Sequence, residues 1–264
     1  MSTEPNKRPN ARPASFPRTP QISYPGLARV DGSARFSFGS TGPCALGSVS
    51  GPIEVRLAAE NASHATLEVL VRPLANIPAT EAKALAATVR GVLAPSLVLV
   101  NNPRTLVQVV VQVLGSGSGK EEERAGVMAA VVNAGTLALL NAGSVPMRGV
   151  VCAVAVGRRV ADAGLVVDPE EGDGALDTEG CFAFMFTRDG AGEMQKKCVW
   201  TNWRAVSEGK ASAGFDEGVL GAARNMAGHA AREVYEAVYR SVDGIGKTQD
   251  VLVLKVEDDD KMDI

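Results

Sequence analysis

The sequence predicts an α/β (α+β) fold, a single domain in which mixed β-sheets pack against α-helices. Short segments with alternating apolar residues mark strands in both halves of the chain. Three longer segments carry helix start and stop signals or an apolar stripe of helical spacing. The two kinds of segment follow each other in the order βββ-α-β-α-ββ-ββ-α, which is typical of sheets and helices mixed in one domain. With 264 residues, 45% of them hydrophobic, the chain can bury such a core without a disulfide or a metal.

Three predicted strands precede the first predicted helix. Residues 27–38 and 44–53 form two strands joined by a turn rich in Gly, Ser and Thr, and residues 65–71 (ATLEVLV) alternate as a third strand. Threonine is a common N-cap, so we expect Thr80 to cap a helix over residues 81–93.

The middle of the chain contains the clearest strand and the second helix. Residues 104–114 (RTLVQVVVQVL) form this strand. One face consists of Val107, Val109, Val111 and Val113, and the other face combines Gln108 and Gln112 with apolar residues. We expect a helix over residues 121–141, because three glutamates stand at its start, where the helix dipole favours negative charge, and Gly143 follows its end.

The second half of the chain predicts four strands and a long helix. Strands are expected over residues 150–156 and 164–168, and a hairpin over residues 181–187 and 197–203. The last helix is expected over residues 216–242. It carries an apolar stripe of helical spacing formed by Val219, Ala223, Met226, Ala230, Val234 and Ala237.

Both ends of the chain differ in composition from the part between them. Residues 1–25 contain six prolines and four basic residues without apolar periodicity, so we expect a disordered, basic, proline-rich arm. This arm is either a solvated tail or a segment that touches RNA or a partner. Residues 257–264 are expected to be a disordered acidic tail, because like charges repel. One folded domain is therefore expected over residues 26–256.

Charge and composition exclude several classes of protein. A net charge of −3 and a pI near 5.6 exclude a uniformly basic surface that would coat nucleic acid. Four cysteines without a C-x-x-C motif predict free thiols in a reducing compartment. The N-terminus lacks the apolar segment of a secretory signal, and we find no run of 18 apolar residues, so we expect no membrane partner.

The residue types of common catalytic centres are scarce. The loop over residues 115–120 (GSGSGK) lacks the first glycine and the Ser or Thr of a Walker phosphate loop, so we interpret it as a connection. With only His64 and His229 available, we expect no Ser-His-Asp triad, no metal site and no cofactor. Carboxylates at Asp168 and Glu170 follow a strand. They either hold magnesium or act as acid and base, or they form a solvated turn, which we favour on local grounds.

Eight short strings in a fixed order resemble the RNase PH family. They are VDGSARF (30–36), SGPIE (50–54), LEVLVRP (67–73), NPRT (102–105), NA (133–134), LLNAG (139–143), VPMR (145–148) and VVDP (166–169). The first three look most like one particular ring subunit of the eukaryotic RNA exosome. The resemblance covers about residues 26–245 and implies a single RNase PH-like domain.

The resemblance also implies a degenerate catalytic site. Active members of the family hold the attacking phosphate with a Gly-Thr/Ser-Arg string, which falls here on Gly126, Val127 and Met128. The hydroxyl and the guanidinium of that string are absent, and with them a charge-assisted contact to phosphate. Active members also carry an acidic string, whose first Asp matches Asp168 and whose second Asp is replaced by Glu170. We therefore expect a chain that is not an enzyme.

For such a chain the resemblance implies a place in the core ring of the RNA exosome. Related RNase PH-like subunits would close a six-membered pseudo-hexameric ring, joined by RNA-binding cap subunits and associated exoribonucleases. Single-stranded RNA would pass through the channel during RNA degradation and RNA processing, including rRNA processing, in the nucleus, nucleolus and cytoplasm. Arg56 and Arg104 fall where family members place arginines near RNA, although each is better explained as a surface arginine or a salt-bridge partner.

Two other functions stay open from the sequence. One is an active phosphate-dependent 3′-to-5′ exoribonuclease of the same family, which the altered phosphate string disfavours. The other is a free-standing homo-oligomer that acts outside the exosome.

Overall fold

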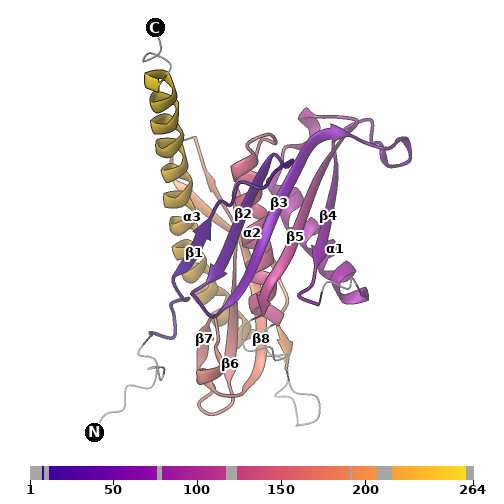
Figure 1. The fold of residues 1–264 in the computed structure, drawn as a ribbon. Coiled ribbons are helices and arrows are strands. Elements are labelled where there is room, and N and C mark those ends of the chain that lie inside the picture. Colours follow the sequence, from indigo (N-terminus) through magenta and orange to yellow (C-terminus); the bar gives the residue numbers. More distant parts are fainter. Residues whose placement is uncertain are drawn as a thin grey trace.

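The computed structural model describes residue 8 and residues 12–75, 79–116, 124–190, 192–206 and 216–259. In this part of the chain, two β-sheets enclose and flank three α-helices (Figure 1). The helices are α1 (Thr80–Leu93), α2 (Arg124–Ala142) and α3 (Glu217–Asp259).

The first sheet has the strand order β1-β2-β3-β5-β4. Its neighbours are antiparallel except for β4 and β5, which run parallel because α1 connects them. The strands are β1 (Pro20–Ser23), β2 (Gly32–Phe38), β3 (Pro43–Glu54), β4 (Thr66–Arg72) and β5 (Thr105–Ser116).

The second sheet is antiparallel throughout. Its order is β10-β8-β6-β7, and β9 also pairs with β8. The strands are β6 (Val150–Arg159), β7 (Leu165–Val167), β8 (Leu176–Arg188), β9 (Met194–Thr201) and β10 (Arg204–Ala205).

Helix α2 lies between the two sheets. It packs against β2, β3 and β5 on one side and against β6 and β8 on the other, while α1 covers β4 and α3 covers β6 and β8. Because α2 is covered from both sides, its residues are buried almost all round and it lacks a polar face. Ala125–Ala142 is long and apolar enough to cross a bilayer by length and composition. Its burial between the sheets accounts for that composition.

One polar side chain fixes α2 to the second sheet. The Asn133 side chain is buried, its Nδ2 donates to the carbonyl oxygen of Ala153 at 2.9 Å, and its Oδ1 accepts from the Ala153 N–H at 2.7 Å. A buried amide that makes both bonds avoids the cost of an unsatisfied polar group. The pair therefore sets the position of the helix along β6.

The main predicted strands and helices are confirmed, with shifts at their ends. The four valines of β5 are all buried, and Gly143 ends α2 with φ of +61° and an N–H bond to the Leu139 carbonyl oxygen at 3.2 Å. The first predicted strand starts at Gly32 instead of residue 27. The predicted cap is wrong: Thr80 is inside α1, and Ala79 is the N-cap without a side-chain bond. The expected helix start at 121–123 and the loop residues 117–120 lie outside the described residues.

The predicted disordered arm is wrong for the part of residues 1–25 that the structure describes. Strand β1 pairs with β2, and the Val167 N–H of β7 donates to the carbonyl oxygen of Ala14 at 2.8 Å, so this segment contacts both sheets. Residues 1–7 and 9–11 lie outside the described residues. At the other end, α3 continues to Asp259, into the predicted acidic tail, of which residues 260–264 lie outside the description.

Candidate functional site

Asp168 follows β7 and lies at the centre of a group of buried charges. Its N–H donates to the carbonyl oxygen of Ala155 at 2.8 Å, and its backbone adopts φ of +48°, which turns the chain away from the sheet. The Asp168 side chain is 1% exposed. An unpaired carboxylate buried to this extent would cost several kcal/mol, so its partners determine what it does.

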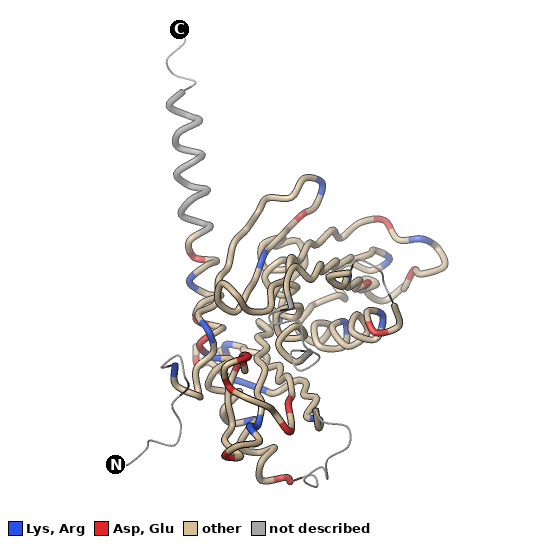
Figure 2. Tube along the Cα trace, turned by 60° about the horizontal axis from the view of Figure 1, so that its bottom comes forward, with Lys and Arg blue, Asp and Glu red and all other residues tan. Residues whose placement is uncertain are grey.

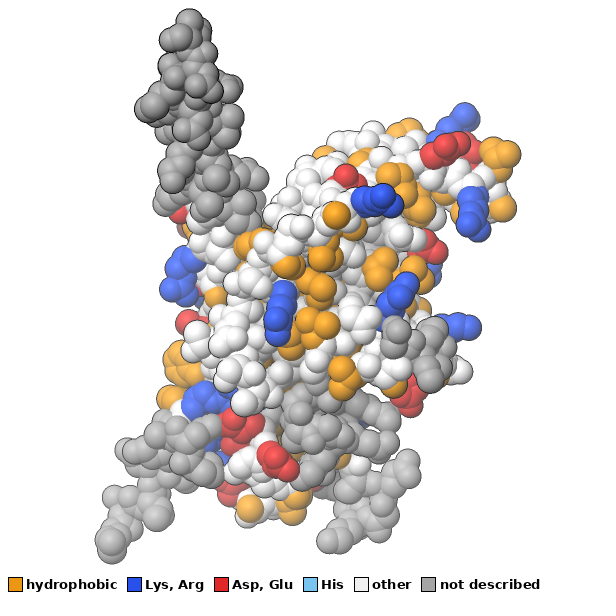
Figure 3. All heavy atoms as spheres, viewed as in Figure 1, with side chains coloured by type: hydrophobic (Ala, Val, Ile, Leu, Met, Phe, Trp, Pro, Cys, Tyr) orange, Lys and Arg blue, Asp and Glu red, His pale blue; other side chains and the backbone are white. Residues whose placement is uncertain are grey.

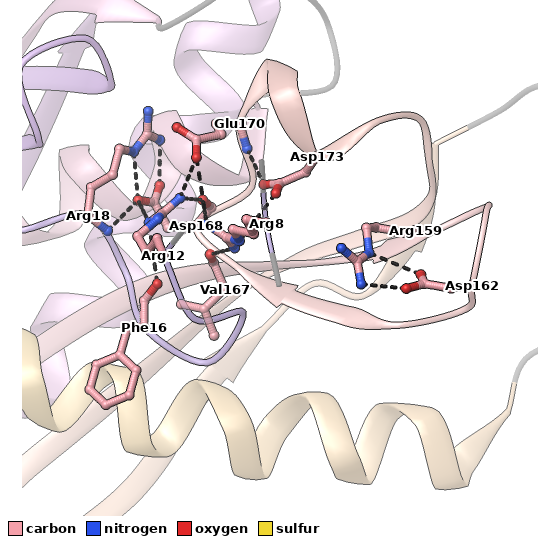
Figure 4. Close-up of polar contacts among 10 residues, drawn as sticks. All are labelled: Arg8, Arg12, Phe16, Arg18, Arg159, Asp162, Val167, Asp168, Glu170 and Asp173. Carbon is pink, nitrogen blue, oxygen red and sulfur yellow. Dashed lines mark hydrogen bonds and ion pairs between the residues drawn. The ribbon is translucent and has the colours of Figure 1, made fainter. Parts of the chain in front are cut away.

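Two arginines of the N-terminal segment bind the Asp168 carboxylate (Figure 4). Arg18 forms a bidentate pair: its Nη2 lies 2.6 Å from Oδ1 and its Nε lies 2.7 Å from Oδ2. The backbone N–H of Arg18 also donates to Oδ2 at 2.8 Å, and Arg12 Nη1 donates to the same oxygen at 3.1 Å. Both oxygens of Asp168 are therefore engaged by the chain's own donors.

The remaining charges of the group are paired in the same way. Arg12 Nη2 donates to Glu170 Oε1 at 3.1 Å, and Arg8 Nε lies 3.2 Å from Asp173 Oδ1. Burial lowers the pKa of Arg8 to about 10, so it stays cationic at neutral pH. We call the six residues the arginine–carboxylate cluster: Arg8, Arg12, Arg18, Asp168, Glu170 and Asp173. Basic and acidic residues meet where the N-terminal segment passes the second sheet (Figure 2).

This arrangement fits a structural role better than acid–base or metal chemistry. A general base or a metal ligand needs an oxygen that faces the reacting group or the ion, whereas Asp168 accepts hydrogen bonds at both oxygens. Across the described ranges, no group of three or more His, Cys, Asp or Glu side chains is arranged to hold a metal ion. Burial raises the pKa of the Cys152 and Cys181 thiols, so neither supplies a thiolate at neutral pH.

The positions expected to hold phosphate lie in the first turn of α2. Gly126 is buried against the start of β3, where a Cβ would come 3.0 Å from Pro43 Cγ. Met128 is 4% exposed and belongs to the hydrophobic core, while Val127 is half-buried at its edge. The side chain at position 128 therefore points into the core, and this position offers no guanidinium to an anion.

The turn before β3 connects the phosphate-string positions with Asp168. Gly42 stands directly before Pro43, and a Cβ on Gly42 would come 2.8 Å from Arg18 Cζ. Because Arg18 is bound to Asp168, the two halves of the predicted site are joined through an arginine side chain. Asp168 and Glu170 are thus placed in one cluster, and Gly126 lies next to the turn that Arg18 fills.

The two arginines expected to contact RNA lie at one end of the first sheet, where β3 ends and β5 begins. The Arg104 side chain is 70% exposed, and its Nε lies 3.3 Å from Glu60 Oε1. Arg56 is exposed and lines a groove together with Lys83 and Arg90. Contact of Arg56 or Arg104 with RNA stays a prediction.

The three arginines of the cluster were not predicted as site residues. Their spacing among prolines indicated a solvated arm, and nothing local shows that their partners lie about 150 residues further along the chain. The sequence does contain one signal: the three arginines of the arm are equal in number and opposite in charge to Asp168, Glu170 and Asp173.

Residues 18–144 match the model of the 3′ exoribonuclease family, domain 1 (RNase PH). This region is similar to an RNase PH domain. Its fold matches the crystal structure of rice (Oryza sativa) Rrp46 with a TM-score of 0.73 and 21% identity, covering 89% of this chain and 100% of the rice chain. It also matches an Archaeoglobus fulgidus exosome with RNA bound to the active site, with a TM-score of 0.62 and 18% identity, covering 88% of this chain and 92% of that one. The predicted fold of mixed sheets and helices is confirmed.

Two curated relatives share sequence with about half of this chain. The exosome complex component rrp46 of Schizosaccharomyces pombe is 36% identical over 128 residues, which are 48% of this chain and 53% of the relative. RRP46 of Saccharomyces cerevisiae is 36% identical over 117 residues, which are 44% of this chain and 52% of the relative. The matched region thus spans about half the length of these relatives. The ring subunit that the first sequence strings resemble most, ribosomal RNA-processing protein 46, carries the same name.

Proposed function

We propose that this chain is a non-catalytic structural subunit of the RNA exosome core ring. It would support 3′-to-5′ RNA processing and degradation by lining the channel and by holding cap and nuclease subunits in place. One observation carries the inactive role: Asp168 and Glu170, which match the acidic string of active members, are bound by the chain's own arginines. The relatives named as exosome complex components support the place in the ring.

The size of the catalytic defect follows from the missing charges. Removing one charge clamp from a transition state typically lowers the rate by about 10²–10³. Here position 128 supplies no cation to the phosphate, since Met128 is buried in the core, and the acidic side is paired with arginines. Two such losses together leave no phosphorolysis that a standard assay would detect.

The inactive role is tested with purified protein, labelled RNA and inorganic phosphate. We expect no release of nucleoside diphosphates above a blank. The matched variant is Glu170→Gln, because that side chain is 23% exposed and its replacement leaves the Asp168 pair in place. Diphosphate release that disappears in this variant would instead identify an active phosphorolytic exoribonuclease.

The place in the ring is tested by native mass measurement of the tagged chain from cell extract. We expect a heteromer with five other RNase PH-like chains in a six-membered ring, together with cap subunits and exoribonucleases, in the nucleus, nucleolus and cytoplasm. A chain found only with copies of itself would contradict the exosome role.

RNA contact in the channel is tested at the two arginines near the end of β3. Charge reversal in Arg56→Glu and Arg104→Glu should reduce crosslinking of single-stranded RNA to the assembled ring, because such binding is by backbone charge. Arg232→Glu on the exposed face of α3 is the matched control. Unchanged crosslinking would remove both arginines from the RNA path.

A further inference from the structure

Strand β4 forms an open edge of the first sheet. It pairs with β5 on one side, and in the described part of the chain no strand pairs with its other side. An edge strand presents unpaired backbone N–H and C=O groups, and is a template for another strand. The long edge strand of the second sheet, β9, carries Lys196 and Lys197, the side chains that proteins use to block such pairing. Strand β4 has no lysine.

The outward face of β4 has a symmetric charge pattern. Glu68, Leu70 and Arg72 are exposed on this face, and Leu70 is 40% exposed, whereas the alternating Leu67, Val69 and Val71 are buried. Glu68 and Arg72 stand two residues to either side of Leu70. An acid and a base placed symmetrically about an apolar residue are complementary to the same segment run in the opposite direction.

We propose that β4 is a self-pairing edge, on which β4 of a second copy of this chain docks antiparallel, centred on Leu70. In that register each Glu68 stands opposite the second copy's Arg72, and the two leucines stand opposite each other. Directly opposed side chains in antiparallel strands lie about 4.5–5.5 Å apart at Cβ, close enough for two ion pairs and an apolar contact. The two first sheets then become one continuous sheet across a two-fold axis.

The sheet around Leu70 extends the apolar contact. Leu70 is the register partner of Val110 in β5, which is half-buried on the same outer face. The space-filling view shows hydrophobic side chains gathered over this face of β3, β5 and β4, with single basic side chains among them (Figure 3). Pairing of two β4 strands would bring the apolar outer faces of the two copies into contact through Leu70 of each copy.

The charges also select the register. A shift by two residues in either direction places Glu68 or Arg72 opposite Leu70 and breaks both ion pairs. A shift by one residue would put the outer face of one strand against the inner face of the other. Only the pairing centred on Leu70 satisfies all four charges.

The helix side of the edge leaves room for a second strand. A groove of about 710 Å³ runs beside β4 and is lined by the small side chains Ala86 and Ala87 of α1. Lys83 and Arg90 also line it, and a second copy would bring the same two cations. Because these cations repel each other, the dimer must be stabilised by the contacts of the outer face, and we expect it to dissociate reversibly.

The experiment uses sedimentation velocity of the purified full chain over a concentration series, so it does not depend on the proposed exosome role. We expect a dimer for the wild type. E68R and R72E should each raise the dissociation constant at least tenfold, because each places like charges opposite each other twice. An equimolar mixture of the two variants should form heterodimers at close to wild-type affinity, since all four opposed charges are then opposite. E233R and R240E on exposed positions of α3 are matched controls with no expected effect.

Two outcomes would overturn the self-pairing edge. One is a wild-type chain that stays monomeric at the highest concentration, even if it enters a ring with other chains. The other is a dimer that neither E68R nor R72E weakens. Failure of the mixture to restore association would also reject the Leu70-centred register. Because Glu68 and Arg72 are exposed, the variants should keep the wild-type circular dichroism spectrum, and that measurement accompanies each of them.

Discussion

The Asp168→Asn variant is expected to lose about 3–5 kcal/mol of the free energy of unfolding, because it leaves buried arginines without their counter-charge. The Arg18 and Arg12 side chains are only 12% and 14% exposed, and both donate to the Asp168 carboxylate. An asparagine has nearly the same shape but no charge and a single acceptor oxygen. The cost therefore comes from electrostatics and lost hydrogen bonds, with little change in packing.

Urea denaturation measures this loss, and Asp162→Asn is the matched control. Asp162 pairs with Arg159 on the same sheet, with Nε 3.0 Å from Oδ1, but its side chain is 42% exposed. Solvent screens such a pair, so the control should lose less than about 1 kcal/mol. Equal losses in the two variants would contradict the special role of the buried cluster.

Limited trypsin digestion gives a second readout of the Asp168→Asn variant. Trypsin cleaves after arginine, and Arg12 and Arg18 are held against the second sheet in the wild type. We expect the variant to be cut in the N-terminal segment well before the rest of the domain. A carboxylate kept only for catalysis would show neither the loss of stability nor the earlier cleavage.

The N-terminal segment shows where sequence reasoning reached its limit. Prolines and arginines without apolar periodicity are typical of a solvated arm, but in the structure Arg12 and Arg18 are largely buried. The order comes from long-range pairing: Arg18 is bound to a residue 150 positions away, and β1 is completed only by β2. Such contacts depend on the tertiary fold, which places the end of β7 beside this segment.

The elements of the core were easier to predict from the sequence. Strand β5 has one face wholly buried, so Val107, Val109, Val111 and Val113 recur at every second position and the pattern is visible. Helix α2 is covered on both sides, so it has no apolar stripe next to a polar face. The glutamates before it and Gly143 after it predicted where the helix lies in the sequence, but not that it lies between the two sheets. Strand β10 has only two residues, too few for any pattern. The first-turn positions of α2 and the carboxylates were found by resemblance, whereas the arginines that bind those carboxylates were not.

Glycine at position 47 sets how closely α2 approaches the first sheet. A Cβ on Gly47 of β3 would lie 2.5 Å from the Ala134 carbonyl oxygen and 3.2 Å from Ala138 Cβ, so the strand and the helix backbone are nearly in contact. Gly32 of β2 is in the same position further along, where a Cβ would lie 2.3 Å from the Ala142 nitrogen. The helix cannot move away from one sheet without pressing on the other, because both sheets cover it.

The Gly47→Ala variant is therefore expected to lose about 3 kcal/mol or more of the free energy of unfolding, at the upper end of what overpacking costs. Thermal or urea unfolding measures it, with Gly91→Ala as the matched control. Gly91 lies on the exposed side of α1, nothing lies within 4 Å of its added Cβ, and alanine there should stabilise the helix by about 0.5–1 kcal/mol. The same substitution is thus expected to lower the free energy of unfolding at position 47 and to raise it at position 91. A small effect at Gly47 would mean that α2 can shift between the sheets, and the Asn133 pair with Ala153 would then have to stretch or break.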